Sequence, residues 1–150
     1  MKKYLLISLF VCLAFSCEDE LYSPIPLAPV NFKLSLNGGD EELNGALSYK
    51  IFTQKRLETD RLGYGGLLVI NAVGANILNL KAYDLSCPVE VDPNTKIKPD
   101  EDGIKATCPK CGAVYNISSN GIPISGSKHP LKQYKVSAGA GISGTYIVTN

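Results

Sequence analysis

The chain has 150 residues, of which 45% are hydrophobic, and its 15 basic and 14 acidic side chains give a formal net charge of +1. This length and composition fit one globular domain with a sizeable core. The near-neutral balance, with no basic patch along the chain, argues against nucleic acid as a partner.

The N-terminus has the features of a secretory signal. Lys2 and Lys3 give a positive start, and the apolar run "YLLISLFVCLAF" follows. That run is too short to span a bilayer as a helix, which takes about 20 apolar residues. Its end, "LAFSC", resembles the lipobox of bacterial lipoproteins, and an ordinary signal with a chance cysteine is the alternative. We therefore expect a signal peptide over residues 1–16 and lipidation at Cys17.

The residues after Cys17 predict how the protein is anchored. The acidic "EDE" resembles the surface-export signal of Bacteroidetes lipoproteins, with a solvated spacer as the alternative. Three prolines in "LYSPIPLAP" are typical of an extended tether. The sequence thus predicts a tether over residues 17–30 and one domain over residues 31–150. It also predicts attachment through the lipid to the outer membrane of the cell envelope, with exposure at the cell surface if the acidic signal operates.

The first half of the domain has the pattern of short strands. Apolar and polar residues alternate over residues 30–37, 44–52 and 76–85, as is typical of half-buried strands. Residues 63–73, "GYGGLLVINAV", form an aliphatic run that predicts a buried strand, and their glycines predict a turn or bulge where backbone passes close to backbone. Good helix formers near residues 40–43 predict at most one helical turn.

The second half continues the same pattern. Short strands are predicted over residues 113–118, 132–138 and 144–150, separated by Gly, Pro, Asn and Ser. Many short strands with frequent turns indicate an all-β fold, either a compact sandwich or a small barrel.

Three cysteines carry the chemistry that the sequence predicts. Cys87 follows the strand-like run "AYDL", and Cys108 and Cys111 form a Cys-x-x-Cys pair in "ATCPKCGAVYNI". A proline follows both Cys87 and Cys108, so each loop leaves its strand through a tight turn. Tight loops with backbone N–H groups turned inward suit the sulfurs of an iron–sulfur cluster.

This layout resembles the Rieske domain, in which one loop carries Cys-x-His and the other Cys-x-x-His around a 2Fe–2S cluster. The runs "AYDLSCP", "CPKCGAVYNI", "NGIPISG" and "HPLKQYKV" are similar to the segments around those loops in the family, and the match covers residues 67–150. The resemblance implies a small Rieske-like β-sandwich or barrel with two cysteine-bearing loops. It also implies iron–sulfur binding and electron exchange with a redox protein.

The sequence departs from the family at both histidines. Val89 stands where the first histidine would fall, and Cys111 stands where the second would fall. Three thiols therefore remain as predicted metal ligands: Cys87, Cys108 and Cys111. A 2Fe–2S cluster or a tetrahedral zinc needs four ligands. The candidates for the fourth are Glu90, His129, Asp84 and water.

Four interpretations of these thiols stay open. The leading one is an exported electron carrier whose 2Fe–2S cluster or iron has an altered ligand set. Its main alternative is a metal-free binding or structural module on the cell surface, in which Cys87 and Cys108, placed on one iron by the resemblance, form a disulfide. The others are zinc held by the three cysteines and His129, and a redox-active Cys108–Cys111 pair.

No catalytic constellation is evident in the sequence. His129, the single histidine, is followed by Pro130 in a predicted turn, and the carboxylates are scattered over polar stretches. We therefore predict that the protein is not an enzyme, and that its partners are the membrane and a redox protein.

Overall fold

Two β-sheets make up the computed structural model, which describes residues 22–74, 78–141 and 143–150. The larger sheet consists of β1 (Val30–Ser35), β2 (Tyr49–Phe52), β3 (Arg61–Leu62), β4 (Leu67–Asn71), β5 (Leu80–Asp84), β10 (Gln133–Ala138) and β11 (Thr145–Thr149). The smaller sheet consists of β6 (Lys98–Pro99), β7 (Lys105–Thr107), β8 (Val114–Asn116) and β9 (Ile122–Ser125). The predicted signal, Cys17 and the start of the tether lie outside the described residues.

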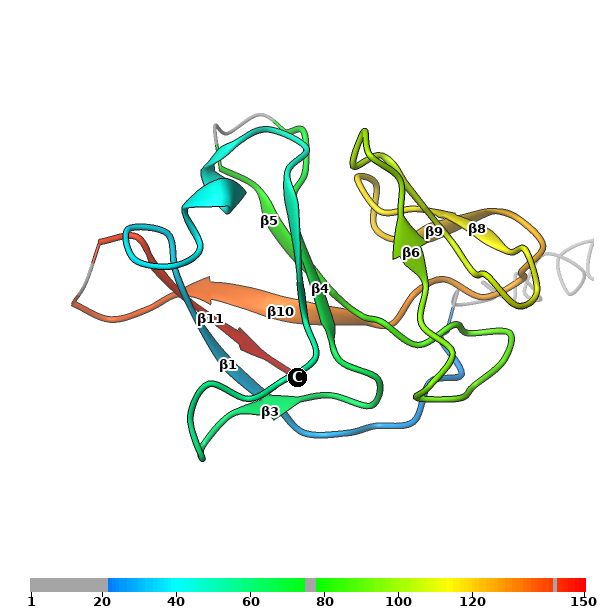
Figure 1. Cartoon of the computed structure of the whole chain (residues 1–150), viewed down its shortest axis with the longest axis horizontal. Helices are drawn as coiled ribbons and strands as arrows, with labels where there is room; N and C mark the ends of the chain where they lie inside the picture. The colour runs from blue at the N-terminus through cyan, green and yellow to red at the C-terminus, as the bar shows by residue number, and fades with distance from the viewer. Residues whose placement is uncertain (1–21, 75–77, 142) are drawn as a thin grey trace, which may run out of the picture.

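The larger sheet is nearly closed and barrel-like, in the order β2-β4-β5-β10-β11-β1-β3, and the smaller sheet β6-β7-β8-β9 stands beside it (Figure 1). A single 3-10 turn, η1 (Glu41–Asn44), joins β1 to β2, close to where one helical turn was predicted. The all-β prediction is confirmed. None of the helices in the described part of the chain has the length and apolarity that crossing a bilayer takes.

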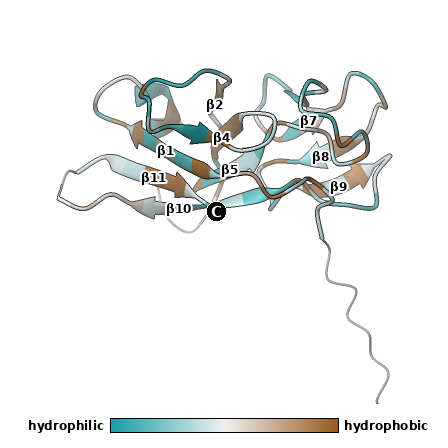
Figure 2. Ribbon diagram, turned by 90° about the horizontal axis from the view of Figure 1, so that it is seen from below, coloured by the Kyte–Doolittle hydropathy of each residue, from teal (hydrophilic) through white to brown (hydrophobic). Residues whose placement is uncertain are grey.

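Strand β4 lies between two hydrophobic cores, which explains its uninterrupted aliphatic sequence. All five of its residues are buried. Leu67 and Val69 belong to the core inside the larger sheet, whereas Leu68 and Ile70 belong to the core shared with the smaller sheet. A strand covered on both faces needs apolar side chains at successive positions rather than at alternate ones. Figure 2 shows this apolar stretch at the centre of the molecule.

The alternating patterns were right for β1 and only partly right for two other segments. Buried and accessible residues alternate along β1, which pairs with β11. The predicted strand over residues 44–52 begins only at Tyr49. The half-buried pattern expected over residues 76–85 fails at the end of β5, where Ala82, Tyr83 and Asp84 are all buried.

Several short strands were not predicted. They are β3, β6, β7 and β9, which are between two and four residues long. The segment "NGIPISG", for which no strand was predicted, contains β9, in which Pro123 pairs with Tyr115 across an irregular register. Proline is tolerated there because β9 is an edge strand and does not need every backbone N–H for pairing.

Candidate metal centre

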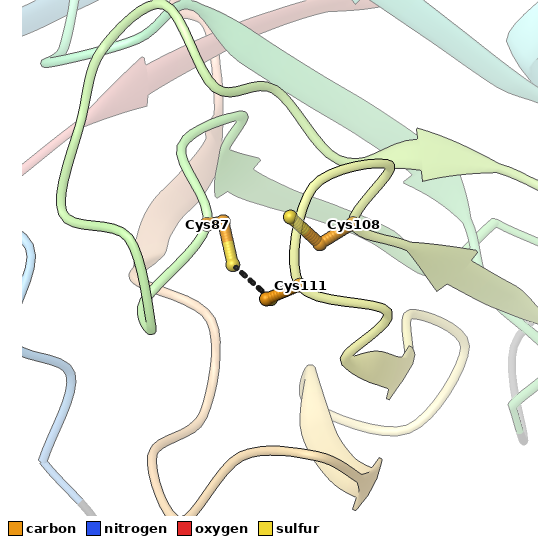
Figure 3. Close-up of side chains that lie close together, drawn as sticks. All are labelled: Cys87, Cys108 and Cys111. Carbon is orange, nitrogen blue, oxygen red and sulfur yellow. Dashed lines mark hydrogen bonds between the residues drawn. The ribbon is translucent and has the colours of Figure 1, made fainter.

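Two loops bring the three cysteines together beside the smaller sheet. Cys87 lies in the connection from β5 to β6, and Cys108 and Cys111 lie in the turn between β7 and β8. The three sulfur atoms are all within 4.8 Å of one another, and the sulfurs of Cys87 and Cys111 are 3.6 Å apart (Figure 3). All three are free thiols; Cys87 and Cys108 are buried, and Cys111 is exposed. This group of residues could hold a metal ion.

Backbone hydrogen bonds fold each loop back toward the sulfurs. In the second loop the Cys108 N–H donates to the carbonyl of Ala113 at 2.9 Å, and the Gly112 N–H donates to the carbonyl of Cys108 at 3.0 Å. Gly112 has φ of +74°, a conformation that other residues rarely adopt. The glycine of "CPKCG" therefore closes the turn that places both thiols on one side. In the first loop the Cys87 N–H donates to the carbonyl of Thr95 at 3.1 Å.

The three thiols differ in their readiness to lose a proton. Burial works against ionisation of Cys108, but hydrogen bonds from the backbone N–H groups of Cys111 and Lys110 outweigh it and lower the pKa of the thiol. Desolvation of the Cys111 sulfur, with the thiols of Cys108 and Cys87 beside it, raises its pKa to about 11. At neutral pH a metal ion must therefore displace at least the Cys111 proton.

The hydroxyl of Tyr115 is part of the site, although the sequence did not predict it. Tyr115 is fully buried on β8, and its oxygen lies 3.7 Å from the sulfur of Cys87. Burial, and the hydrogen bond to Cys87, raise the pKa of this phenol, so it remains a hydrogen-bond donor. Donors to sulfur stabilise negative charge on a metal-bound thiolate. The only sequence signal was an aromatic residue shortly after the Cys-x-x-Cys pair.

Glu90 and His129 are engaged elsewhere. The carboxylate of Glu90 forms an ion pair of 2.5 Å with the Lys110 amine, which links the two cysteine loops. His129 is exposed, and its Nδ1 lies 3.0 Å from the carbonyl oxygen of Tyr22. Among the described residues, the group of mutually close ligand atoms contains only the three cysteines.

Asp84 holds the first cysteine loop rather than facing the thiols. This carboxylate has no exposed surface, and it accepts hydrogen bonds from four groups. They are the N–H groups of Tyr64 at 2.8 Å, Gly65 at 3.1 Å and Ser86 at 2.8 Å, and the hydroxyl of Tyr134 at 2.7 Å. The glycine turn predicted at residues 63–66 is confirmed over residues 63–65, and backbone passes close to backbone there, because a Cβ on Gly66 would lie 2.9 Å from the carbonyl oxygen of Phe52.

Glu90→Gln and His129→Ala, which change the other two candidates for the fourth ligand, are each expected to leave the metal content unchanged. In Glu90→Gln the ion pair with Lys110 is lost, and in His129→Ala the contact with Tyr22 is lost, but the three thiols stay in place. The measurement is the metal-to-chain ratio after loading with Zn²⁺ and gel filtration. A fall in that ratio for one variant alone would identify its side chain as a ligand.

Comparison with known proteins identifies no family and no function for this group of cysteines. No protein-family model matches the chain, and no curated protein is significantly similar to it. The arrangement of Cys87, Cys108 and Cys111 is therefore the observation from which a function can be argued.

Proposed function

We propose that this protein is a metal-binding lipoprotein of the cell envelope whose Cys87, Cys108 and Cys111 bind one thiophilic metal ion. The observation that carries the proposal is the mutual proximity of the three sulfurs. All three lie within 4.8 Å of one another, and those of Cys87 and Cys111 are 3.6 Å apart. Sulfurs that share one tetrahedral ion with bonds of about 2.3 Å lie about 3.8 Å apart. The thiols therefore need to move little to bind such an ion.

The donor set decides which ions suit the site. Thiolates favour soft or borderline ions such as Cu⁺, Zn²⁺ and iron over Mg²⁺ or Ca²⁺. The backbone N–H groups that lower the pKa of Cys108 also stabilise the thiolate that such an ion requires. Because Cys111 is exposed, we assign the remaining position of a tetrahedral ion to water. The signal-like residues 1–16 and Cys17 support the envelope location.

A 2Fe–2S cluster is the second candidate, and a one-electron carrier would be its function. The Rieske resemblance implies this cluster, and the Tyr115 hydroxyl, 3.7 Å from the Cys87 sulfur, supplies a hydrogen-bond donor of the kind that cluster sulfurs need. A two-iron cluster spreads its protein ligands over two metal atoms, so ligands on different irons lie farther apart than ligands on one. Three sulfurs that are all close neighbours fit one ion better.

Metal analysis of anaerobically purified full chain separates these functions. For the proposed single-ion site we expect one metal ion per chain and no acid-labile sulfide. Two irons and two labile sulfides per chain, with visible charge-transfer bands, would instead establish the cluster. A chain that takes up neither iron, zinc nor copper under reducing conditions would reject metal binding and favour the metal-free surface module.

Replacing Cys111 by serine is expected to weaken metal binding by more than about 100-fold. Loss of a group that merely orients a ligand costs 10–100-fold in affinity, and here a ligand itself is lost. Affinity is measured by competition with a chromophoric chelator. Val89→Ser is the matched control, since it places serine at an exposed position of the first cysteine loop, leaves the three thiols in place and is expected to bind as tightly as wild type. Equal affinities of the two variants would remove Cys111 from the ligand set.

A further inference from the structure

We propose that Cys87 and Cys111 are also an oxidation site, at which a hydroperoxide such as hydrogen peroxide converts the two thiols into a disulfide and thereby removes the metal ligands. This inference goes beyond metal binding and does not require it. It rests on the contact between these two sulfurs, 3.6 Å apart (Figure 3), and on the burial of Cys87 against the exposure of Cys111.

The geometry favours this pair over the other two pairs of thiols. A disulfide bond is about 2.0 Å long, so the Cys87 and Cys111 sulfurs must approach by about 1.6 Å. Cys111 lies at an exposed loop tip, where rotation of its side chain can supply that movement. The sulfur of Cys108 also lies within 4.8 Å of the other two, but its side chain is buried and has less room to rotate than that of Cys111.

The difference in solvent exposure indicates which thiol reacts with the peroxide and which one then forms the disulfide with it. Cys111 is exposed, whereas Cys87 and Cys108 have 0% and 1% of their surface accessible. A peroxide dissolved in water therefore meets Cys111 first. Cys87 is in contact with the Cys111 sulfur and is protected from direct attack, as the second thiol of such a pair should be.

The chemistry balances in two steps. The Cys111 thiol holds its proton at neutral pH and first gives it up to solvent. The resulting thiolate attacks one oxygen of hydrogen peroxide; the O–O bond breaks, the hydroxide that leaves takes up a proton to become water, and the sulfur becomes a sulfenic acid. The Cys87 sulfur then attacks the Cys111 sulfur; the S–O bond breaks, the S–S bond forms and water leaves, with the Cys87 proton passing to the departing oxygen. Two thiols lose two electrons in total, and one peroxide becomes two waters. An external dithiol reverses the change by thiol–disulfide exchange.

The disulfide and a metal ion compete for the same sulfurs. The disulfide leaves only Cys108 as a thiol, and one thiolate is a poor site for the ions considered above. A bound ion, in turn, engages the lone pairs that would attack the peroxide. Oxidation is therefore expected to release metal, and bound metal to slow oxidation.

The test uses the full chain in detergent, with Cys12→Ser and Cys17→Ser so that Cys87, Cys108 and Cys111 are the only thiols. The chain is reduced, freed of metal with a chelator, separated from the reductant and treated with hydrogen peroxide. Free thiols are then alkylated, and the protein is digested and analysed by mass spectrometry. We expect two of the three thiols to disappear, a peptide linking Cys87 to Cys111, and full reversal by dithiothreitol.

Three results would overturn the proposal. They are retention of all three thiols at a peroxide concentration that oxidises glutathione, a linked peptide that contains Cys108 in place of Cys87 or Cys111, and sulfinic acid at Cys111 without any linked peptide. Because the measurement uses metal-free wild-type loops, a protein that binds no metal can still pass it. A protein that binds metal can likewise fail it, so the two proposals are tested separately.

Variants of the same chain test whether Cys111 is oxidised first and Cys87 then forms the disulfide with it. Cys108→Ser is expected to form the Cys87–Cys111 disulfide at about the wild-type rate. Cys87→Ser combined with Cys108→Ser leaves Cys111 without a neighbouring thiol, so its sulfenic acid should persist and react with dimedone. Dimedone labelling of Cys108 in a chain with Cys87→Ser and Cys111→Ser, without labelling of Cys111 in the first double variant, would contradict the assignment of Cys111 as the thiol that meets the peroxide.

Discussion

Replacing Asp84 by alanine is expected to lower the free energy of unfolding by about 4 kcal/mol, measured by urea denaturation of the reduced protein. The substitution leaves three backbone N–H groups and the hydroxyl of Tyr134 without their acceptor in a buried environment. Each such group costs about 1–3 kcal/mol, and water that enters the vacated space recovers part of the sum.

Tyr134→Phe is the matched comparison, because it removes one of the four donors and keeps the carboxylate. Burial, with the negative charge of Asp84 beside it, holds the pKa of Tyr134 above its usual value, so the phenol remains a donor at all ordinary pH values. Its loss is expected to cost about 1 kcal/mol. If Asp84→Ala cost no more than Tyr134→Phe, the three N–H groups would not depend on the carboxylate.

The importance of Asp84 could not be predicted from its surroundings in the sequence. The alternating pattern over residues 76–85 gave it the place of a polar residue on a half-buried strand. Two of its four donors belong to Tyr64 and Tyr134, which are 20 and 50 residues away along the chain. Only the packing of the glycine turn against β5 and β10 brings them together, and periodicity carries no information about such contacts.

The cysteine site was predictable to a different extent. Local chemistry forms each loop, since Cys-Pro steps and the glycine after Cys111 specify tight turns that short-range patterns reveal. The meeting of Cys87 with the Cys-x-x-Cys turn followed from the Rieske resemblance and agrees with the structure. The Cys87 sulfur contacts both Cys111 and the Tyr115 hydroxyl, and these contacts depend on how the smaller sheet packs against β5. No short-range pattern encodes that packing.

The apparent affinity for a metal ion is expected to rise at least tenfold per pH unit between pH 6 and 8. The bound ion needs thiolates, whereas the free protein holds a proton on Cys111, whose pKa is raised to about 11. Binding therefore releases that proton throughout this range, and each released proton contributes a factor of ten per pH unit. The dependence steepens below the lowered pKa of Cys108, where a second proton must leave.

The measurement is competition with a chromophoric chelator at several pH values, corrected for protonation of the chelator itself. His129→Ala is the control, because it removes the single imidazole of the chain, which is one of the candidates for the fourth ligand. Its slope is expected to equal that of the wild type, because His129 lies against Tyr22 rather than beside the thiols. A shallower slope in this variant would place the imidazole among the ligands, and an affinity independent of pH would mean that thiols which hold a proton in the free protein do not bind the ion.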